Sequence, residues 1–427
     1  MSQKQRQIYR ICLLGLLIIV LSVMVVYWYW GVQRMVPDEI MIYENQLENI
    51  NLEIPFTQVS LSSEDVESTQ VSVNRSEKVN GQIQFSMSES VAIKAAKCGS
   101  VSGEAKLFGW LPCKKIRIDV REEARVMPVG SAVGLYVHAD GVMVLGTGKV
   151  SGKNGATYTP SYDILQTGDY IYEVNGTSVL TIQDIIRLIQ KNGTERLVLS
   201  VNRGSRKIKV KLKPVQADDG SYQIGVWLRE DTEGIGTLTF VTEQNEFAAL
   251  GHGITDADTE LLIRLQNGGL YPASIDHVVA GKNGSPGELT GSVELGNQNR
   301  LGTIRNNTAL GITGDVTSEK YKYREDKAYR IGRKQEVQKG KATILCQLDD
   351  RVREYQVEIE EINLSSEDNK GIEIHVTDSR LLQQAGGIVQ GMSGAPLLQN
   401  GKCIGAVTHV FVKDVTRGYA TFIENML

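Results

Sequence analysis

The stretch that most constrains the fold is Gly391-Met392-Ser393-Gly394-Ala395-Pro396, continued by Leu397-Leu398-Gln399-Asn400-Gly401-Lys402-Cys403-Ile404-Gly405-Ala406-Val407-Thr408-His409-Val410. Two apolar runs flank an Asn-Gly dipeptide, which is a strong signal for a tight β-hairpin. Ser393 stands between small residues just ahead of the first run. The stretch therefore predicts a serine on a tight loop, followed by strand, turn and strand.

The loop around Ser393 has the features of a nucleophile loop. Small neighbours let a substrate backbone approach the hydroxyl. Gly391 lets the chain turn so that its amide and the amide of Ser393 point at one spot, which would form an oxyanion hole. The second barrel of chymotrypsin-type proteases presents its serine in this way. A plain β-hairpin with a Gly-Ser turn is the alternative interpretation.

A serine hydroxyl needs a base, usually a histidine, to take its proton. His252 lies in Leu250-Gly251-His252-Gly253, at the end of an apolar run, and opens the domain that Ser393 closes. Structural or surface roles explain the remaining histidines better. These are His138, His277, His375 and His409.

The histidine in turn needs a carboxylate that holds its tautomer. Asp276 and Asp315 lie between the histidine and the serine, where chymotrypsin-type chains usually keep theirs, and Asp378 lies shortly before the serine. Asp256 and Asp258 follow the histidine too closely to be obvious candidates. Spacing alone does not choose among these aspartates, most of which must be ordinary turn residues.

The N-terminal segment predicts the compartment. Ile11–Trp30 carries no charge, and about 20 apolar residues span the hydrocarbon core as a helix. Tyr27–Trp30 would form an aromatic belt at the far interface, and the basic flank would stay in the cytoplasm. A cleaved signal peptide needs a shorter core and a small-x-small site, which Gly31–Arg34 does not offer. We expect an uncleaved anchor with the rest of the chain outside the cytoplasm. The basic flank is Lys4, Arg6 and Arg10.

Composition bounds the remaining classes. With 427 residues the chain can build two or three domains, and 43 glycines with few aromatic residues suit a turn-rich β protein. The net charge of −4 implies neither nucleic acid nor an anionic surface as partner. A Cys98–Cys113 disulfide is one option, but small buried thiols are favoured. The cysteines show no metal-site spacing and are Cys12, Cys98, Cys113, Cys346 and Cys403.

Residues 125–230 form a recognisable unit. Short strands are predicted at 134–137 and 141–146. A helix is predicted over Thr181–Gln190, because isoleucines recur there at helical spacing, Thr181 is a plausible N-cap and Gly193 closes the end. The stretch Gly168-Asp169-Tyr170-Ile171-Tyr172-Glu173-Val174-Asn175-Gly176 ahead of this helix resembles a PDZ domain.

The PDZ resemblance implies that an extended peptide adds to a sheet edge beside the helix. The polar loop Tyr158–Ile164 departs from the usual small, apolar loop, which leaves the groove's specificity open. Gly134-Leu135 and Gly141-Val142 both qualify as the carboxylate-binding loop. A PDZ domain that only braces its neighbours is the alternative.

The other segments read as β structure. Residues 31–124 are expected to hold a linker and a β segment with strands over 84–122. Residues 57–82 are rich in Ser, Glu, Gln and Asn and are expected to be a flexible, protease-accessible linker or a weakly structured β segment. From about residue 233 Gly-rich turns separate short strands, which predicts an all-β, barrel-type domain over 231–427.

Several of these stretches together resemble the stage IV sporulation protein B peptidase family of endospore-forming bacteria. The order of anchor, PDZ unit and serine peptidase also matches that family. Gly253 after the histidine and Ala395 after Ser-Gly are modest departures. The matching stretches are Gly387–Pro396, Gln399–Lys402, Gly405–Val412, Ala249–His252 with Asp256 shortly after, Ile224–Arg229, Gly234–Phe240 and Ser285–Glu288.

The resemblance implies a mainly β chain with a transmembrane helix (11–30) after a cytoplasmic N-terminus (1–10), a PDZ domain and a chymotrypsin-like double β-barrel. It implies a serine endopeptidase in which Ser393 is the nucleophile, His252 the base and Asp378 the orienting acid. The amides of Gly391 and Ser393 would stabilise the oxyanion. No metal or organic cofactor is needed.

The same resemblance implies a signalling protease of sporulation. Such a protein is made in the forespore, is exported into the space between forespore and mother cell, and releases itself by self-cleavage. It cuts a regulator of an intramembrane metalloprotease, which then activates a late sigma factor. The segment 57–82 is the expected place of self-cleavage, because it is polar and poor in core residues.

Two alternatives stay open at this point. The chain could be a membrane-tethered PDZ scaffold with an inert protease-like domain, although His252 and Ser393 both stand in glycine-framed loops. It could also be an envelope quality-control protease, although such proteases usually place the PDZ domain after the protease domain. Broad turnover of casein would favour quality control, and restricted cleavage would favour signalling.

Overall fold

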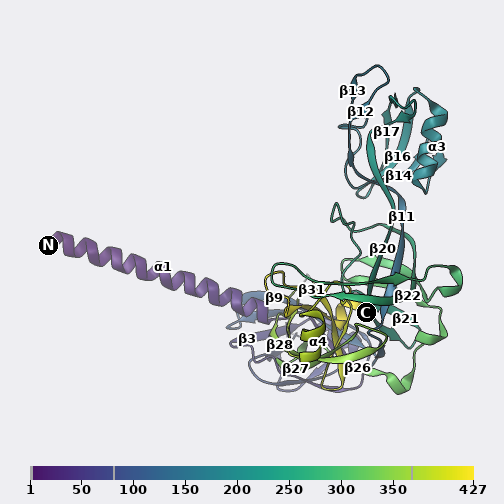
Figure 1. The fold of residues 1–427 in the computed structure, drawn as a ribbon. Helices are drawn as coiled ribbons and strands as arrows, with labels where there is room; N and C mark the ends of the chain where they lie inside the picture. Colours follow the sequence, from purple (N-terminus) through teal and green to yellow (C-terminus); the bar gives the residue numbers. More distant parts are fainter. Residues whose placement is uncertain (1–2, 80–81, 367–368) are drawn as a thin grey trace. The chain divides into compact units, whose positions relative to one another are not determined.

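One long helix begins the chain. The computed structural model describes residues 3–79, 82–366 and 369–427, and its first element is α1 (Gln3–Met35) (Figure 1). The part Cys12–Met35 is long and apolar enough to cross a membrane. Most of its apolar side chains are exposed. The expected span Ile11–Trp30 lies within this helix, so it has the length that an anchor requires.

The chain divides into two compact units. The first comprises the described parts of Met1–Ala124, Arg330–Gly340 and Ile359–Glu373, and the second comprises Arg125–Tyr329, Lys341–Glu358 and Ile374–Leu427. Each unit has its own buried apolar cluster. The chain is mainly β, as expected.

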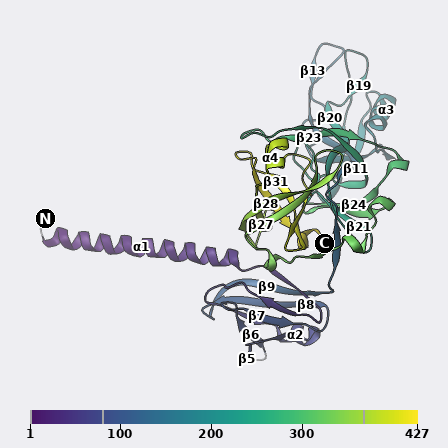
Figure 2. The same cartoon turned by 60° about the horizontal axis from the view of Figure 1, so that its bottom comes forward.

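In the first unit α1 leads into two small sheets (Figure 2). Their inward side chains form one apolar core, in which Val59 and Ile93 are fully buried. The larger sheet has the order β1 (Glu39–Tyr43), β9 (Leu111–Arg121), β8 (Gly99–Leu107), β3 (Thr57–Leu61), β6 (Gln82–Ser86) and β5 (Glu77–Val79). The smaller sheet contains β2 (Leu47–Ile50), β7 (Val91–Lys94) and β4 (Ser72–Val73), and the short helix is α2 (Ser63–Thr69).

The segment 57–79 is ordered structure, which departs from the flexible linker that its polar composition suggested. Strand β3 pairs with β6 on one side and with β8 on the other. Val59, Leu61, Val71 and Val73 are buried in the core. A few alternating apolar residues are enough here because the neighbouring strands supply the rest of the buried surface. The other expectation, a β segment, describes these residues better.

The second unit contains a closed ring of antiparallel strands. β11 (Ala132–Thr147) pairs with β20 (Val226–Thr242), β20 with β21 (Glu246–Ala249), and β21 with β25 (Gly311–Val316). The ring continues through β24 (Gly302–Thr308) and β22 (Leu265–Val279), which pairs back to β11. Leu238, Phe247 and Ile304 fill its interior. This ring is the first barrel.

A second ring follows in the C-terminal half. It runs through β27 (Gly340–Gln347), β28 (Val352–Ile362), β29 (Ile372–Val376), β32 (Arg417–Phe422), β31 (Lys402–Val410) and β30 (Pro396–Gln399), and β30 pairs back to β27. Ile344, Leu397 and Ala406 are fully buried. The two rings give the double β-barrel that the sequence predicted.

The predicted hairpin after the serine is confirmed. β30 and β31 are joined by Asn400 and Gly401, whose φ angles are 51° and 73°. Both lie in the left-handed region, as a tight two-residue hairpin turn requires. The remaining short elements of the second unit are β10 (Arg125–Pro128), β23 (Glu288–Val293), β26 (Tyr329–Ile331) and α4 (Ser379–Ala385).

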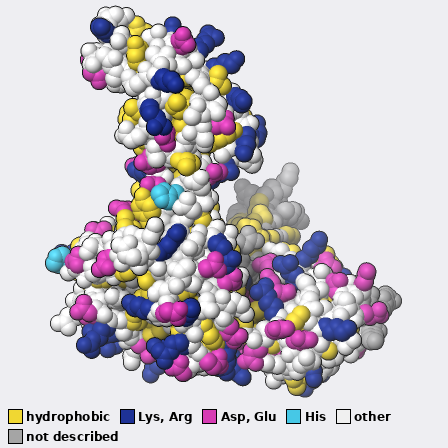
Figure 3. Space-filling model, turned by 90° about the vertical axis from the view of Figure 1, so that its right-hand side faces the viewer, with side chains coloured by type: hydrophobic (Ala, Val, Ile, Leu, Met, Phe, Trp, Pro, Cys, Tyr) yellow, Lys and Arg dark blue, Asp and Glu magenta, His cyan; other side chains and the backbone are white. Residues whose placement is uncertain are grey.

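The PDZ region is built on the far ends of β11 and β20. In place of two short strands at 134–137 and 141–146, β11 is one long strand that continues from the first barrel into the PDZ region, with an irregularity between His138 and Met143. Exposed Lys and Arg side chains lie on this region, in the upper part of Figure 3. Its other elements are β12 (Val150–Ser151), β13 (Thr157–Tyr158), β14 (Asp169–Val174), β15 (Thr177–Ser178), α3 (Ile182–Asn192), β16 (Leu197–Arg203), β17 (Arg206–Leu212), β18 (Val215–Gln216) and β19 (Tyr222–Gln223).

The helix of the PDZ region is confirmed with its caps. Thr181 caps the N-terminus of α3 and exchanges hydrogen bonds with Asp184, and Gly193 ends the helix. Asp169 of the Gly-Asp pair is buried and accepts two hydrogen bonds from Arg203 at 2.8 and 2.7 Å. The Asp of this motif therefore holds the sheet together and is not free to bind a ligand.

Candidate active site

The serine loop precedes β30 of the second barrel. Ser393 is half-buried, and its Oγ donates a hydrogen bond to the carbonyl oxygen of Thr408 at 2.9 Å. Gly394 has a φ of +94°. A Cβ at this position would lie 2.3 Å from the carbonyl oxygen of Thr237 and 2.5 Å from the amide nitrogen of Leu250. The loop therefore needs a glycine here, because it packs directly against the first barrel.

The histidine loop follows β21 of the first barrel. Leu250 and Gly251 have φ angles of 71° and 69°, and this turn presents His252. The ring Nδ1 lies 3.0 Å from the carbonyl oxygen of Gly253. Since a carbonyl oxygen only accepts, this contact favours the tautomer with the proton on Nδ1. The lone pair is then on Nε2, which is the atom that a general base needs.

Ser393 and His252 line one cavity of about 750 Å³. One residue comes from each barrel, and Gly391, Thr408 and His409 line the same cavity. The rings of His252 and His409 are 5.3 Å apart between centroids. In the described chain no hydrogen bond joins the serine hydroxyl to His252, because the hydroxyl points to Thr408. A rotation of the serine side chain is needed before proton transfer, as is common in sites without substrate.

Thr237 ties the two loops together. Its amide donates to the carbonyl oxygen of Ser393 at 3.0 Å, and its Oγ1 donates to the carbonyl oxygen of Gly391 at 2.8 Å. Its own carbonyl oxygen accepts from the amide of Leu250 at 3.3 Å. A single buried residue of β20 therefore contacts both the serine loop and the histidine loop. Sequence reasoning missed it, although the stretch Gly234–Phe240 contributed to the family resemblance.

The peptide planes around the proposed oxyanion hole are held from outside the loop. The carbonyl oxygen of Gln390 accepts from the amide of Leu289 at 2.8 Å, and the amide of Gln390 donates to Gly287 at 2.8 Å. Because N–H and C=O point in opposite directions in a trans peptide, the amide of Gly391 faces away from Leu289. Among the described residues neither the Gly391 amide nor the Ser393 amide has a hydrogen-bond acceptor. Both are free to bind an oxyanion.

Asp378 lies elsewhere in the second barrel. It is buried, caps the N-terminus of α4, and accepts hydrogen bonds from Arg380 and from the amide of Gln356. The Arg380 side chain holds the pKa of this carboxyl well below its usual range, and the amides of Gln356 and Arg380 add to the effect. No hydrogen bond or ion pair joins Asp378 to His252 in the described chain. The orienting role of Asp378 stays a prediction.

The other aspartates that the spacing left open are engaged in local contacts. Asp276 accepts hydrogen bonds from Ser274 and Ser292 at 3.3 and 3.4 Å. Asp315 pairs with Arg305 at 2.8 Å. Buried Asp256 and exposed Asp258 both bind Arg229. Within the described residues none of these four aspartates forms a hydrogen bond or ion pair with His252.

One wall of the catalytic cavity is acidic. Asp231 and Glu233 of β20 line it together with Arg229. The charge of Arg229 is already matched by two aspartates. Asp231 accepts from Tyr136 at 2.5 Å and contacts His138 Nδ1 at 2.6 Å. The hydrogen bond to Asp231 raises the pKa of Tyr136 to about 12, with burial adding to the effect. The wall keeps negative charge near the serine, a feature that sequence reasoning did not find.

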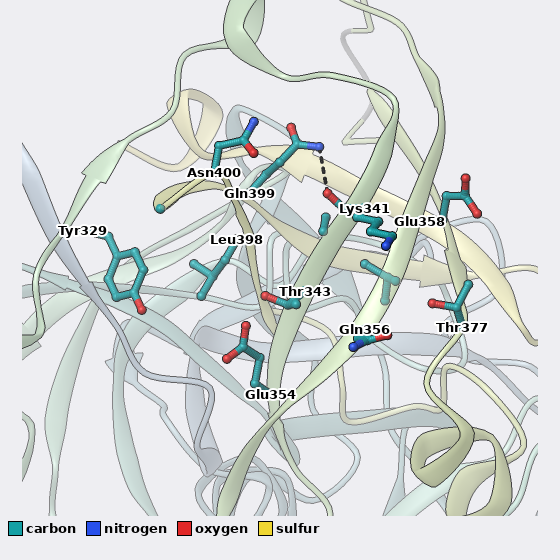
Figure 4. Close-up of a pocket in the computed structure, with 13 residues that line it drawn as sticks. Tyr329, Lys341, Thr343, Glu354, Gln356, Glu358, Thr377, Leu398, Gln399 and Asn400 are labelled. Atoms are coloured by element: carbon teal, nitrogen blue, oxygen red, sulfur yellow. Dashed lines mark hydrogen bonds between the residues drawn. The ribbon is translucent and has the colours of Figure 1, made fainter.

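A further cavity of about 640 Å³ lies on the second barrel (Figure 4). Its lining mixes charges and amides from several strands and contains neither Ser393 nor His252. Gln399 Nε2 donates to the carbonyl oxygen of Lys341 at 3.2 Å across its edge. Volume does not distinguish the two cavities, so the predicted nucleophile and base mark the one with Ser393 and His252 as the candidate catalytic cavity.

The cysteines form no disulfide within the described chain. Cys113, Cys346 and Cys403 are buried thiols, as favoured by the sequence. Cys98 is exposed, so the expectation of a buried thiol is wrong at that position. Cys12 lies in the expected membrane span and is exposed as well. Burial raises the pKa of the Cys403 thiol to about 12. Cys403 therefore has little thiolate character and is not a rival nucleophile.

Comparisons with known proteins agree with this site. Residues 220–427 match the family described as SpoIVB peptidase S55, and residues 159–203 match the PDZ domain family. A comparison with curated proteins finds no match. Together with the double barrel, the family matches define a serine peptidase that carries a PDZ domain. The matched region, residues 220–427, is a SpoIVB-type peptidase domain.

Solved structures resemble parts of the chain. The PDZ domain of an SdrC-like protein from Listeria monocytogenes is 25% identical, with a TM-score of 0.17, over 21% of this chain and 87% of that one. The HtrA-type protease AlgW, solved with a decapeptide, is 10% identical, with a TM-score of 0.26, over 70% of this chain and 62% of that one.

Proposed function

We propose that this chain is a membrane-tethered, self-cleaving serine endopeptidase of sporulation. It acts from the space between forespore and mother cell and cuts a regulator of an intramembrane metalloprotease that activates a late sigma factor. The observation that carries the catalytic part is the cavity to which the two barrels contribute Ser393 and His252. The signalling role is supported by the family match over residues 220–427.

The proposed reaction is acyl transfer. The Ser393 hydroxyl leaves the Thr408 carbonyl oxygen and attacks the substrate carbonyl, while Nε2 of His252 takes its proton. The amides of Gly391 and Ser393 stabilise the oxyanion, and such a donor is typically worth about 3–4 kcal/mol. The imidazolium then protonates the leaving amine, and water releases the acyl group by the same steps in reverse order.

The third member of the proposed triad is Asp378. To reach the imidazole its carboxylate would leave Arg380, and His252 Nδ1 would exchange the carbonyl oxygen of Gly253 for it. The family match over residues 220–427, a range that contains Asp378, supports this role. The buried, ionised state of Asp378 is also suited to stabilising an imidazolium.

Self-cleavage is proposed within 57–82, at the turn between β4 and β5. Asn74, Arg75 and Glu77 are exposed there, whereas β3 is paired on both sides and is protected. A protease needs an extended, accessible segment, which this turn provides most readily. N-terminal sequencing of the released product checks the position, and a cut inside 130–210 would contradict it.

The proposed anchor is α1, with the other domains outside the cytoplasm. The length and hydropathy of Cys12–Met35 support it. The PDZ domain is proposed to bind an extended peptide of the substrate or of the chain itself. Extraction of membranes with alkaline carbonate should leave uncut chain in the membrane fraction and cut chain in the supernatant.

Covalent labelling with a fluorophosphonate tests the catalytic assignment. The wild-type chain should be labelled, and Ser393→Ala should not. His252→Ala should be labelled far more slowly, because the hydroxyl then has no base. Equal labelling of wild type and Ser393→Ala would remove Ser393 as nucleophile. Turnover of casein beside the chain's own cleavage would separate broad quality control from restricted signalling.

A further inference from the structure

The membrane-proximal end of α1 is joined rigidly to the β domain of the first unit. Tyr29 OH donates to the carbonyl oxygen of Pro112 at 3.0 Å, and Gln33 Nε2 donates to that of Cys113 at 2.9 Å. Val32 and Val36 are buried in the core of that domain. The helix therefore passes into the domain without a flexible linker, and the depth of one fixes the depth of the other.

Two turns of the β domain lie beside the aromatic end of this helix. The ring of Trp28 lies 6.4 Å from Phe56 and 5.8 Å from Phe108, and the two phenylalanines are 5.3 Å apart between centroids. The amide of Phe108 donates to the carbonyl oxygen of Phe56 at 2.7 Å. Phe56 precedes β3 and Phe108 follows β8, so paired strands present both turns at the same end of the sheet.

These turns expose large apolar side chains. Three aromatic side chains form what we call the aromatic rim: Phe56, which is 60% exposed, Phe108, which is 52% exposed, and Trp110, which is 71% exposed. Single exposed apolar residues are common on protein surfaces. Phe56 and Phe108, however, contact each other and Trp28 of a candidate membrane helix. This is a different case, because exposed contiguous apolar surface marks an interaction site.

The backbone of the rim is strained in order to present these side chains. Phe56 and Phe108 have φ angles of 57° and 54°, in the left-handed region. Bulky residues are rare there, and Gly or Asn usually takes such positions. Neither phenylalanine gains burial in return. The conformation and the exposure together indicate that the rings face an apolar phase outside the protein.

The depth of the rim follows from the helix. The uncharged run ends at Trp30, and Trp side chains at the end of a span lie at the membrane–water interface. Because Phe56 and Phe108 contact Trp28, they lie at the same depth. We propose that the aromatic rim inserts into the interfacial layer of the phospholipid bilayer that α1 crosses. The β domain is then docked on the membrane surface. This proposal rests on the proposed anchor.

The strand directions say which end of the domain faces away from the bilayer. After α1 the chain continues into β1, which pairs in parallel with β9, from Glu39 opposite Arg117 to Tyr43 opposite Arg121. The β8–β9 turn therefore lies on the membrane side, and the other end of this hairpin points away from it. Ser100, opposite Asp119, lies at that far end. With about 3.3 Å per residue it is roughly 25 Å from the rim.

Spin labels on the full chain in phosphatidylcholine vesicles test the docking. The exposed thiols are first removed by Cys12→Ser and Cys98→Ser, and a single label is then attached at Trp110→Cys, with Ser100→Cys as the matched control. The label at position 110 should be several-fold more accessible to oxygen, and several-fold less accessible to a water-soluble nickel chelate, than the label at 100. Equal, water-like accessibility at both positions would overturn the docking.

Two further variants separate the possible failures. A label at Val23→Cys, in the middle of the uncharged run, reports on the anchor: water-like accessibility there would remove the anchor itself. If the label at position 23 shows membrane-like accessibility and the label at 110 shows water-like accessibility, the anchor stands and only the docking fails. Adding Phe56→Asn and Phe108→Asn should shift the label at 110 toward water. Asn adopts the left-handed backbone conformation readily, but its polar side chain does not partition into the bilayer. An unchanged depth would contradict a role for the rings.

Discussion

The amide of Leu289 donates a hydrogen bond to the carbonyl oxygen of Gln390 at 2.8 Å. Leu289 belongs to β23, which pairs with β22 in a hairpin of the first barrel, whereas Gln390 belongs to the serine loop of the second barrel. The peptide plane that carries the Gly391 amide is thus fixed by the opposite barrel. The amide that we propose as an oxyanion donor therefore depends on a contact between the barrels as much as on the serine loop itself.

Gly287→Ala should impair catalysis from outside the serine loop. A Cβ at Gly287 would lie 2.0 Å from the carbonyl oxygen of Val279 and 2.5 Å from the amide nitrogen of Gly281. The segment that holds Gln390 must then move, and loss of one oxyanion donor lowers kcat by about a hundredfold or more. Gly284→Asn is the control, because a Cβ there meets no atom within 4 Å. Unchanged kcat in a folded Gly287→Ala would refute this account.

Thr237→Val should lower kcat with little change in KM. The substitution keeps the shape of the side chain but removes the hydroxyl that binds the Gly391 carbonyl oxygen. An unpaired buried acceptor costs about 1–3 kcal/mol, so a loss of about tenfold is expected. Thr237→Ser keeps the donor and should restore most of kcat. If both variants lose the same activity, packing rather than the hydrogen bond is responsible.

Asp378→Asn separates catalysis from helix capping. Asn caps helices about as well as Asp, so α4 should remain folded, while a triad that loses its carboxylate loses about 10⁴-fold in kcat. Arg380→Gln is the matched control, since it removes the ion pair and keeps the carboxylate. Peptide hydrolysis is measured for both variants, and kcat should fall only for Asp378→Asn. Full activity of Asp378→Asn would exclude it from the triad.

The same carboxylate should make the free energy of unfolding depend on pH in the acidic range. The Arg380 side chain, together with backbone amides, holds the pKa of Asp378 well below its usual range in the folded chain. The carboxyl of an Asp in an unfolded chain has a pKa of about 3.9. The stabilisation is therefore complete above that pH and is lost as the pH falls from there toward the folded value. Urea unfolding of Ser393→Ala should show this loss below about pH 4, and adding Asp378→Asn should reduce the slope.

The acidic wall of the cavity should favour basic substrates. Asp231 and Glu233 line the cavity of Ser393, and Arg229 is occupied by two aspartates. Paired peptides that differ by one Lys-to-Gln change, at successive positions around the cleaved bond, should differ in kcat/KM at one or two positions. Asp231→Asn with Glu233→Gln should remove the preference. A preference that survives both substitutions would mean that other residues select the side chain.

Local signals predicted local structure well. The Asn400-Gly401 turn and the helix capped by Thr181 and Gly193 appear where the sequence indicated, because nearby residues alone decide them. The glycines around Ser393 and His252 indicated loops, and both loops line one cavity. The mainly β fold, the PDZ domain and the serine peptidase class also followed from the sequence.

Contacts between distant segments were beyond the sequence. The sequence around Thr237 and Leu289 does not indicate that they bind the loop at 390–393, because those hydrogen bonds depend on the packing of one barrel against the other. The same limit applies to Asp378, where the sequence resemblance suggests catalysis and the structure adds an ion pair with Arg380. The segment 57–79 misled for another reason: it is mostly polar, but its few buried apolar residues, Val59, Leu61, Val71 and Val73, are enough to anchor it in the core.

Strand β20 begins in the PDZ region and passes Thr237, which bonds to the serine loop, before it ends at Thr242. Val226 and Thr237 belong to the same uninterrupted strand, and β11 is paired with it through most of that length. Such a two-stranded ribbon resists bending far more than a loop would. A twist imposed on the PDZ end of this ribbon by a bound peptide would therefore reach Thr237 through the paired backbones. It would shift the serine loop, because Thr237 bonds to that loop.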